Sequence, residues 1–370
     1  MRTKLLLFLI FVSGIVVGQE YNKEYFKRKY DTVISGNSEP SLNRMIEYTN
    51  SNNSYHFMAL GYFFNANNLM YKETKDTKYL NYNLEVLNSL IFDKNSKGNY
   101  VLNKWPIKVA QKHMSASYND QESLVYEGYF FRYLAEFYDI IISQDLFGDR
   151  QQEIKQALEY AFNKWSEPSM KNFGDYSSVQ HLRLHIGSHW ATVAMYLNKH
   201  TKKKEYLAFY TAFNSQVKKA LKRQSKSGNI CYVWNSTYPE RFNLALRRRS
   251  SYDPVLQDVS HGNHVVQFIL DSYNLGYGRW GKNDIQYLSN TVKYLLWQPK
   301  TKSFADMVDG TRSIDKTFVG EGWKQSDGWM KLVFFDNSLK DIYQAFYKEN
   351  EERITSKFQS LQTLAVLYCS

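Results

Sequence analysis

The sequence is poor in residues that interrupt helices. Its 370 residues include only 18 glycines and 6 prolines, and alternating β-branched runs are few. Apolar residues instead recur at helical spacing along nearly the whole chain, which argues against a β-rich protein and indicates an all-α one. After the first 18 residues, no stretch approaches the roughly 18 apolar residues that a membrane-spanning helix requires. We therefore expect no membrane span.

Cysteine is equally rare, with only Cys231 and Cys369 present. An oxidising compartment would permit a disulfide between them, but Cys369 is the penultimate residue, so the bond would tie down only the chain end. Neither cysteine has the surroundings of a nucleophile. The Walker loop, the dinucleotide-binding fingerprint and the serine nucleophile elbow are also absent. These absences argue against nucleotide-dependent and serine-hydrolase functions.

The first 18 residues, MRTKLLLFLIFVSGIVVG, have the parts of a secretory signal peptide. Arg2 and Lys4 form a basic start, an apolar run follows, and Val16 and Gly18 precede the expected cleavage site. No cysteine follows that site, so a lipid anchor is not expected. We predict a signal peptide over residues 1–18 and a periplasmic or secreted mature protein.

The formal net charge is +11, and aromatic residues make up 16% of the chain. For an exported protein, an acidic polysaccharide or oligosaccharide is a better expected partner than a nucleic acid. Sugar rings stack well on aromatic side chains, although helix cores use the same residues. Genome composition alone also produces chains rich in Lys, Asn and Tyr, so charge and aromatic content agree with a glycan partner without requiring one.

The helical periodicity predicts about twelve helices, which alternate in character. The apolar segment LVYEGYFFRYLAEFYDII is followed by the more polar QQEIKQALEYAFNKW. A helix enclosed by neighbours is apolar all round, whereas an outer helix keeps a polar face. The alternation predicts an (α/α) toroid of about six helical hairpins, with an open α-solenoid as the alternative. We expect one domain over residues 19–370. The predicted helices are 21–35, 41–50, 54–72, 77–92, 121–143, 150–165, 177–198, 203–224, 261–275, 283–297, 326–347 and 350–367, with a strand at 229–234.

Polar residues gather in the stretch YDPVLQDVSHGNH (residues 252–264), directly before the apolar run VVQFILDSYNLG. Ser260 is the predicted N-cap of the helix that follows. His261 and His264 lie in its first turn, where the helix start disfavours imidazolium and so favours a neutral, basic ring. Both are candidate general bases. In the alternative interpretation His261 helps to cap the helix and His264 packs against a neighbouring one.

Tyr252 opens this stretch and follows the triplet Arg247-Arg248-Arg249. Nearby positive charge favours phenolate, so Tyr252 is a candidate catalytic acid or base. The arginines can hold a carboxylate through paired hydrogen bonds. The alternatives are a packing role for the tyrosine and a solvated surface for the arginines.

His181, His185 and His189 are spaced to form one stripe on a helix. A metal held by His185, His189 and His261 is one interpretation. However, no HExxH pattern and no nearby Cys accompany them, so we predict neither a metal nor another cofactor. The histidines otherwise form hydrogen bonds between helices, or one of them acts in acid–base chemistry or substrate binding.

Three carboxylates and a tryptophan complete the candidate site residues. Glu127, Asp258 and Glu321 can supply the carboxylate pair of a glycoside hydrolase, although carboxylates at helix starts often only cap a neighbour. Trp323 is flanked by glycine in VGEGWKQSDGW and is a candidate sugar platform. The polar groups stand at the starts of the presumed inner helices, which a toroid would bring to a single rim.

Over roughly residues 120–335 the chain resembles the α/α-toroid polysaccharide lyases of the alginate-lyase-like group. The segment His185 to Trp190 is similar to a polar-then-aromatic inner-helix segment of that family. Tyr252 is similar to its catalytic Tyr, and Arg249 to the neighbouring Arg. The segment HIGSHW lacks the paired Asn of the family, so Asn263 or Arg249 would have to neutralise the substrate's carboxylate.

This resemblance implies an exported lyase that cleaves an anionic, uronate-containing glycan by β-elimination. It implies Tyr252 as acid or base and His261 or His189 as the base that removes the C5 proton. Arg249 and Asn263 would surround the carboxylate, and Trp323 would be the platform. The alternatives are a glycoside hydrolase on the same fold, using Glu127, Asp258 or Glu321, and a non-catalytic glycan-binding protein.

Overall fold

The computed structural model describes residues 21–49, 55–90, 92–94, 100–102, 123–180, 183–237 and 255–370. Helices dominate this part of the chain, and its strands form three antiparallel two-stranded ribbons. The α-helices are α1 (Lys23–Ile34), α2 (Leu42–Thr49), α3 (His56–Thr74), α4 (Lys78–Ser89), α5 (Leu124–Ser143), α6 (Gly148–Phe173), α7 (Ser177–Gln180), α8 (Leu184–Thr201), α9 (Lys204–Ala220), α11 (Val259–Asn274), α12 (Lys282–Asn290), α13 (Lys340–Thr355) and α14 (Ser360–Cys369). The other elements are the π-helix η2 (Thr291–Leu296), the 3-10 helices η3 (Met330–Phe334) and η4 (Asn337–Leu339), and the strands β1 (Phe92–Lys94), β2 (Tyr100–Leu102), β3 (Lys222–Lys226), β4 (Asn229–Val233), β5 (Trp297–Gln298) and β6 (Ser303–Phe304).

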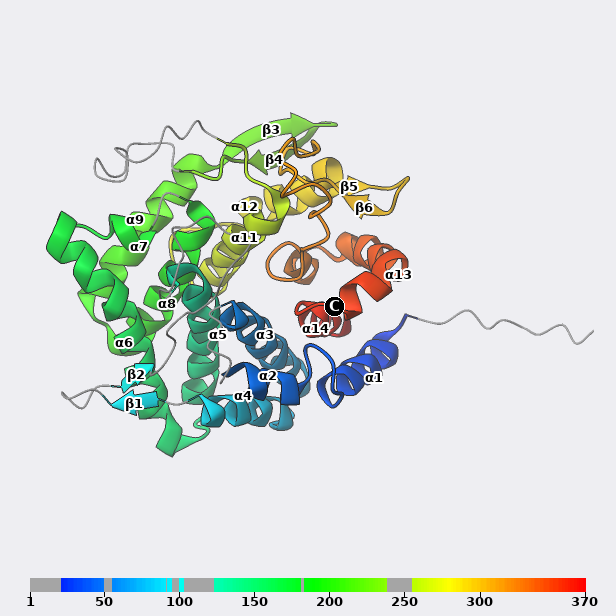
Figure 1. The fold of residues 1–370 in the computed structure, drawn as a ribbon. Helices are drawn as coiled ribbons and strands as arrows, with labels where there is room; N and C mark the ends of the chain where they lie inside the picture. Colours follow the sequence, from blue (N-terminus) through cyan, green and yellow to red (C-terminus); the bar gives the residue numbers. More distant parts are fainter. Residues whose placement is uncertain are drawn as a thin grey trace, which may run out of the picture.

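The helices form a closed ring, which confirms the predicted (α/α) toroid (Figure 1). Around the inside, α3 packs on α5, α5 on α8, and α8 on α11. The segment leading into η3 bonds to α11, η3 touches α14, and α14 returns to α3. A second layer lies outside, with α4 on α3, α6 on α5, α9 on α8, and α1 and α13 on α14.

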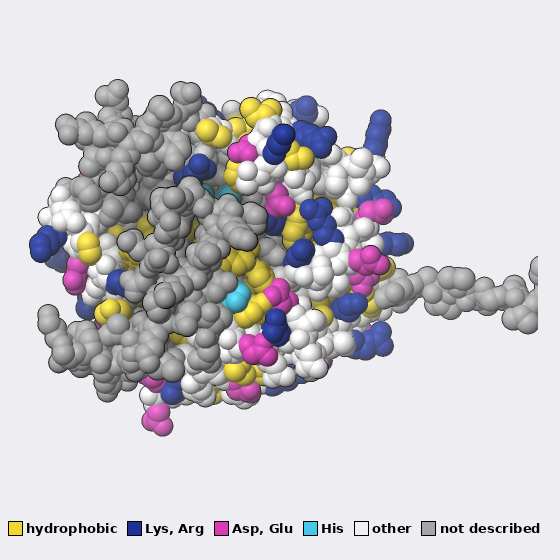
Figure 2. Space-filling model, viewed as in Figure 1, with side chains coloured by type: hydrophobic (Ala, Val, Ile, Leu, Met, Phe, Trp, Pro, Cys, Tyr) yellow, Lys and Arg dark blue, Asp and Glu magenta, His cyan; other side chains and the backbone are white. Residues whose placement is uncertain are grey.

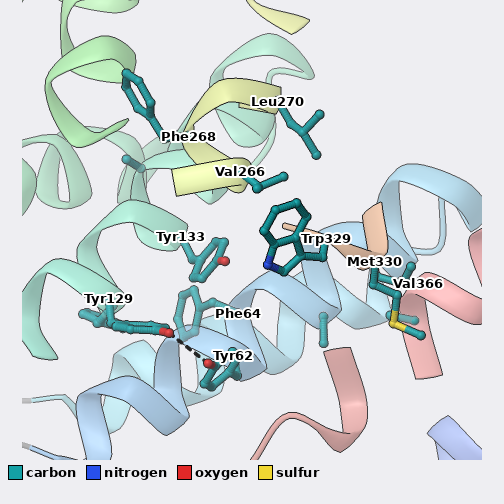
Figure 3. Packing of buried hydrophobic residues seen from close by; sticks show 14 of the residues in the cluster. Tyr62, Phe64, Tyr129, Tyr133, Val266, Phe268, Leu270, Trp329, Met330 and Val366 are labelled. Carbon is teal, nitrogen blue, oxygen red and sulfur yellow. Dashed lines mark hydrogen bonds between the residues drawn. The ribbon is translucent and has the colours of Figure 1, made fainter. Parts of the chain in front are cut away.

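Burial separates the two layers as the sequence predicts. In α5 every residue from Tyr126 to Tyr138 is buried, as expected for an inner helix with neighbours all round. In α9 the buried residues recur at spacings of three and four, so only one face is covered. Figure 3 shows how side chains from different inner elements meet, with Trp329 beside Val266 and Tyr62 bonded to Tyr129.

The structure corrects several predicted helices. The helix expected over 326–347 is replaced by η3, η4 and the start of α13. At Gly328 the backbone lies so close to α11 that a Cβ would collide with the carbonyl of Asn263, and Asp336 caps a new turn at Ser338. Helix α13 then runs to Thr355 before α14 begins, which divides the region predicted as 350–367 differently.

Two further predicted helices are interrupted or end early. The helix expected over 177–198 is divided into α7 and α8, and the one expected over 203–224 ends at Ala220. Strand β3 follows it and pairs with β4, which confirms the predicted strand at 229–234 to within a residue. Cys231 and Cys369 are both free thiols. None of the helices in the described part of the chain is long and apolar enough to cross a membrane.

Candidate functional site

Side chains from three inner helices meet in the middle of the ring. Tyr129, His189 and His264 each lie in the second turn of their helix, α5, α8 and α11 respectively. Their ring centroids lie 4.4 Å apart for Tyr129 and His189, 4.5 Å for Tyr129 and His264, and 5.0 Å for the two histidines. The ring therefore brings together polar groups far apart in sequence.

At the start of α11 a carboxylate holds an imidazole. Asp258 is the N-cap, and its side chain accepts the backbone N–H of His261 at 2.9 Å. Ser260, the predicted N-cap, instead donates its hydroxyl to Asp258 Oδ1 at 2.6 Å. His261 Nδ1 lies 2.9 Å from Asp258 Oδ2, and Gln257 donates to the same oxygen at 3.1 Å.

This Asp258–His261 pair is arranged for proton transfer. Burial acts to raise the pKa of Asp258, but the His261 side chain and the bonds around the carboxylate outweigh it and lower that pKa to about 2. An ionised carboxylate only accepts hydrogen bonds, so His261 donates through Nδ1, and in its neutral form Nε2 is the acceptor. The His261 side chain is 35% exposed. An imidazole oriented by a carboxylate is the usual form of a general base.

His185 lies beside this pair and links it to the ring centre. Its ring centroid is 4.3 Å from that of His261 and 6.4 Å from that of His264. The ring centroid of Phe318 lies 5.5 Å from that of His261. The structure therefore brings together four of the histidines that the sequence singles out.

A second Asp–His pair lies deeper. His264 Nδ1 is 2.6 Å from Asp327 Oδ2, and its Nε2 contacts the hydroxyl of Tyr129, which also bonds Tyr62 at 2.9 Å. The side chains of His264 and Asp327 are 4% and 0% exposed. Burial lowers the pKa of His264 to about 3 and raises the pKa of Asp327, because each charged form is deprived of water.

Arg132 of α5 is fully buried at the centre of this network. Its guanidinium lies 3.5 Å from Asp327 Oδ2, 3.7 Å from Asp271 Oδ2 and 3.1 Å from His189 Nδ1. Burial raises the pKa of Asp271 to about 6 and lowers the pKa of Lys331, which donates to Gln267 nearby. Charges at this depth persist only when they are paired.

Two predicted substrate-binding residues form hydrogen bonds with other parts of the protein. Glu127 faces α6, where it pairs with Lys164 at 3.0 and 3.1 Å and accepts from Trp165 at 2.9 Å. Asn263 is 1% exposed, and its side-chain oxygen accepts the backbone N–H groups of Gly328 and Trp329 at 2.7 and 3.0 Å. Its side-chain oxygen ties the segment before η3 to α11, and its role at a substrate carboxylate stays a prediction.

The predicted platform and third carboxylate lie on the segment before η3. Trp323 is only 9% exposed, and the guanidinium of Arg353 lies 4.9 Å from its ring centroid. A ring covered in this way offers little face to a sugar in this arrangement, and the platform role of Trp323 stays a prediction. Glu321 forms an ion pair with Lys324.

Three predicted residues, Tyr252, Arg249 and His181, lie outside the described residues, as does the predicted signal peptide. Among the residues that are described, no group of three or more His, Cys, Asp or Glu is placed to hold a metal ion. Figure 2 shows Lys, Arg, Asp and Glu side chains interspersed over the described part of one face.

Sequence reasoning missed Tyr129, Arg132 and Asp327. Arg132 stands in the apolar segment FFRYLAEF, and a cation inside an inner helix must have partners. The position of Arg132 in an apolar helix was therefore a signal in the sequence for a paired, buried charge. Asp327 stands at the start of the helix expected over 326–347, and nothing in its sequence neighbourhood indicates His264 as its partner.

No protein-family model and no curated protein matches the sequence. Among solved structures, an inactive variant of the α-1,6-mannanase GH76A of a Salegentibacter species, in complex with α-1,6-mannotetrose, superposes with a TM-score of 0.44. The two chains are 11% identical over 85% of this chain and 88% of that one. A D-mannose isomerase gives a TM-score of 0.44 and 11% identity over 90% of this chain and 97% of that one. Likenesses this distant carry no functional argument.

Proposed function

We propose that this protein is an exported carbohydrate-active enzyme that cleaves an anionic, uronate-containing glycan by β-elimination. The observation that carries the proposal is the Asp258–His261 pair, which is partly open to solvent at the start of α11 and flanked by His185. The net charge of +11 favours an acidic partner. The site is rich in imidazole, which suits removal of a proton from carbon.

In this reaction His261 Nε2 takes the proton from C5 of a uronate. The electron pair of that C–H bond forms the C4=C5 double bond, the C4–O4 bond breaks, and O4 leaves with a proton from an acid. Asp258 holds the imidazole and stabilises the imidazolium that forms. Tyr252 remains our sequence-based prediction for the acid. Charge developing on the uronate carboxylate sets the barrier, so donors to that carboxylate matter most.

Hydrolysis by a carboxylate pair is the alternative, and the described geometry favours it less. A glycosidase needs one carboxyl that remains protonated near neutral pH and reaches the glycosidic oxygen. Asp258 has a lowered pKa, and Glu127 is engaged by Lys164. Two carboxyls of raised pKa, Asp271 and Asp327, are buried within the ring.

The test is incubation of the protein with a panel of alginate, polygalacturonate, hyaluronate and heparosan. A lyase generates a product whose conjugated double bond absorbs ultraviolet light. No such product from any polymer would overturn the proposal. New reducing ends without that absorbance would indicate a hydrolase, and binding without turnover a glycan-binding protein.

The chain offers a matched control for His261. His200 also pairs with a carboxylate, its Nε2 lying 2.7 Å from Asp139, but it stands in the last turn of α8. We expect His261→Gln to lower kcat/KM by about 10²–10⁴-fold, as for loss of a general base. His200→Gln should retain activity, so an equal loss in both variants would point to damage to the fold.

A further inference from the structure

One contact at the ring centre assigns the tautomer of His189. Arg132 Nη1 lies 3.1 Å from His189 Nδ1. A guanidinium stays protonated and has only donors, so Nδ1 must accept this hydrogen bond. Burial, reinforced by the Arg132 charge, holds the pKa of His189 well below its usual range. A neutral imidazole that accepts through Nδ1 carries its proton on Nε2.

The Nε2–H group of His189 has no hydrogen-bond partner among the described residues, although it is fully buried. Two neighbouring rings, 4.4 and 5.0 Å away between centroids, have other partners: Tyr129 bonds His264 and Tyr62, and His264 bonds Asp327. A buried donor without an acceptor is costly, so such a group usually has a water or ligand oxygen as its partner.

We infer that Arg132 is a positioning residue that locks His189 as an Nε2–H donor, and that this donor binds a carboxylate or hydroxyl oxygen of the bound sugar. The inference rests on the proposed function for the identity of the ligand, but not for the tautomer. It removes His189 from the candidate bases, because its basic nitrogen is occupied.

The position of the guanidinium is fixed from two directions. Asp327 and Asp271 approach it at 3.5 and 3.7 Å, so their carboxylates hold Arg132 in place while it donates to His189. At Gly128 helices α5 and α8 are so close that a Cβ would lie 2.9 Å from the Cβ of His189. The two helices that carry Arg132 and His189 are therefore held in register.

The test is nitrogen-15 NMR of the full chain with labelled histidine, with the His189 signals assigned by their loss in His189→Gln. If Arg132 fixes the tautomer of His189, Nε2 should stay protonated and Nδ1 unprotonated from neutral pH to about pH 5. An ordinary histidine would instead take up a second ring proton near pH 6.5. A protonated Nδ1, or an imidazolium in that range, would overturn the inference. The labelled His200 in the same sample reports on general changes.

A second arm adds trimers of galacturonate, mannuronate and glucuronate, with cellotriose as the uncharged control. A new hydrogen bond should shift the His189 Nε2–H proton downfield with at least one uronate trimer. If a trimer binds or is cleaved while this proton does not move, the ligand half of the inference is wrong. If no trimer binds, that half fails together with the proposed function, and the tautomer result still stands alone.

Enzyme variants separate positioning from folding. Arg132→Lys keeps the positive charge but loses the fixed donor, and kcat should fall by about 10²–10³-fold, as for loss of a donor to developing charge. In the double variant Arg132→Lys/His189→Gln an amide donor replaces the imidazole and has no tautomer to lose, so activity should partly return. A double variant no better than Arg132→Lys would show that Arg132 acts in some other way.

Discussion

Two Asp–His pairs stand close together at α11, one at its entrance and one inside the ring. Asp258 and His261 are joined at 2.9 Å, and Asp327 and His264 at 2.6 Å, in both cases through Nδ1. The His261 side chain is 35% exposed and that of His264 only 4%. The chemistry of the contacts is the same, but the access of water differs.

That difference reverses the electrostatics of the carboxylates. The pKa of Asp258 falls to about 2, despite burial, because a histidine and several donors surround it. The pKa of Asp327 rises, because burial outweighs the nearby cations. The outer pair therefore keeps an ionised carboxylate beside an imidazole that solvent reaches, whereas the inner pair is shielded from water and holds neighbouring groups in position. Residue types alone do not assign a role to an Asp–His contact.

The largest effect should follow the loss of the central cation. Arg132→Met leaves Asp271 and Asp327 buried without their partner, and breaking a buried pair in this way costs about 3–5 kcal/mol of the free energy of unfolding. Urea unfolding measures it. The control is Arg150→Met, which breaks a partly exposed pair with Glu153 worth about 0–1 kcal/mol. Similar losses of unfolding free energy in both variants would contradict the expectation that the buried ion pairs matter more than the exposed one.

The outer pair should matter for both activity and stability. Asp258→Asn keeps an N-cap of equal quality but loses the charge that holds His261 in its basic tautomer. We expect kcat to fall about 10²–10³-fold, in line with the transition-state charge that is lost. At neutral pH the free energy of unfolding should also fall, by about 2–3 kcal/mol, because the folded pKa of Asp258 lies below its unfolded value. A variant with full activity would show that the pair is only a helix cap.

The pH dependence of stability should distinguish the pairs. The pKa of His264 is about 3 when folded and about 6.5 when unfolded, so its contribution is complete above pH 6.5 and is lost as pH falls toward 3. The contribution of Asp258, with a folded pKa of about 2, is lost only below about pH 4.

The measurement is urea unfolding of His264→Gln and the parent chain between pH 7 and pH 4. The variant should be less sensitive to pH by up to about 1.4 kcal/mol per pH unit. Asp271, whose pKa is raised to about 6, contributes with the opposite sign but is present in both proteins. Parallel curves would contradict a neutral, buried His264.

The smallest effect should come from the residue first predicted as the N-cap. Ser260→Ala removes one hydrogen bond to Asp258 but leaves the cap itself intact. The free energy of unfolding should fall by about 0.5–1.5 kcal/mol, the usual value of one hydrogen bond. Asp258→Ala, which deletes the cap and the partner of His261, should cost more in the same assay. A larger loss in Ser260→Ala than in Asp258→Ala would show that Ser260 is the N-cap.

Much of the fold was predictable because it depends on local patterns. The segment around Arg132 is apolar on all sides and α9 on one side only, which separates inner from outer helices before any contact is known. The helix expected over 326–347 failed for a non-local reason. Its backbone lies against α11 at Gly328, where contacts with Asn263 replace helical hydrogen bonds.

By itself, the sequence determined that this chain is helical, layered and basic, and that His261 stands three residues after an acid. These properties depend on composition and on spacings within a turn or two. Only the tertiary structure decided that Asp327 meets His264, that Arg132 donates to His189, and that Glu127 turns to α6. Partners this distant in the chain are selected by which faces of which helices meet, and burial then decides which of the groups stay charged.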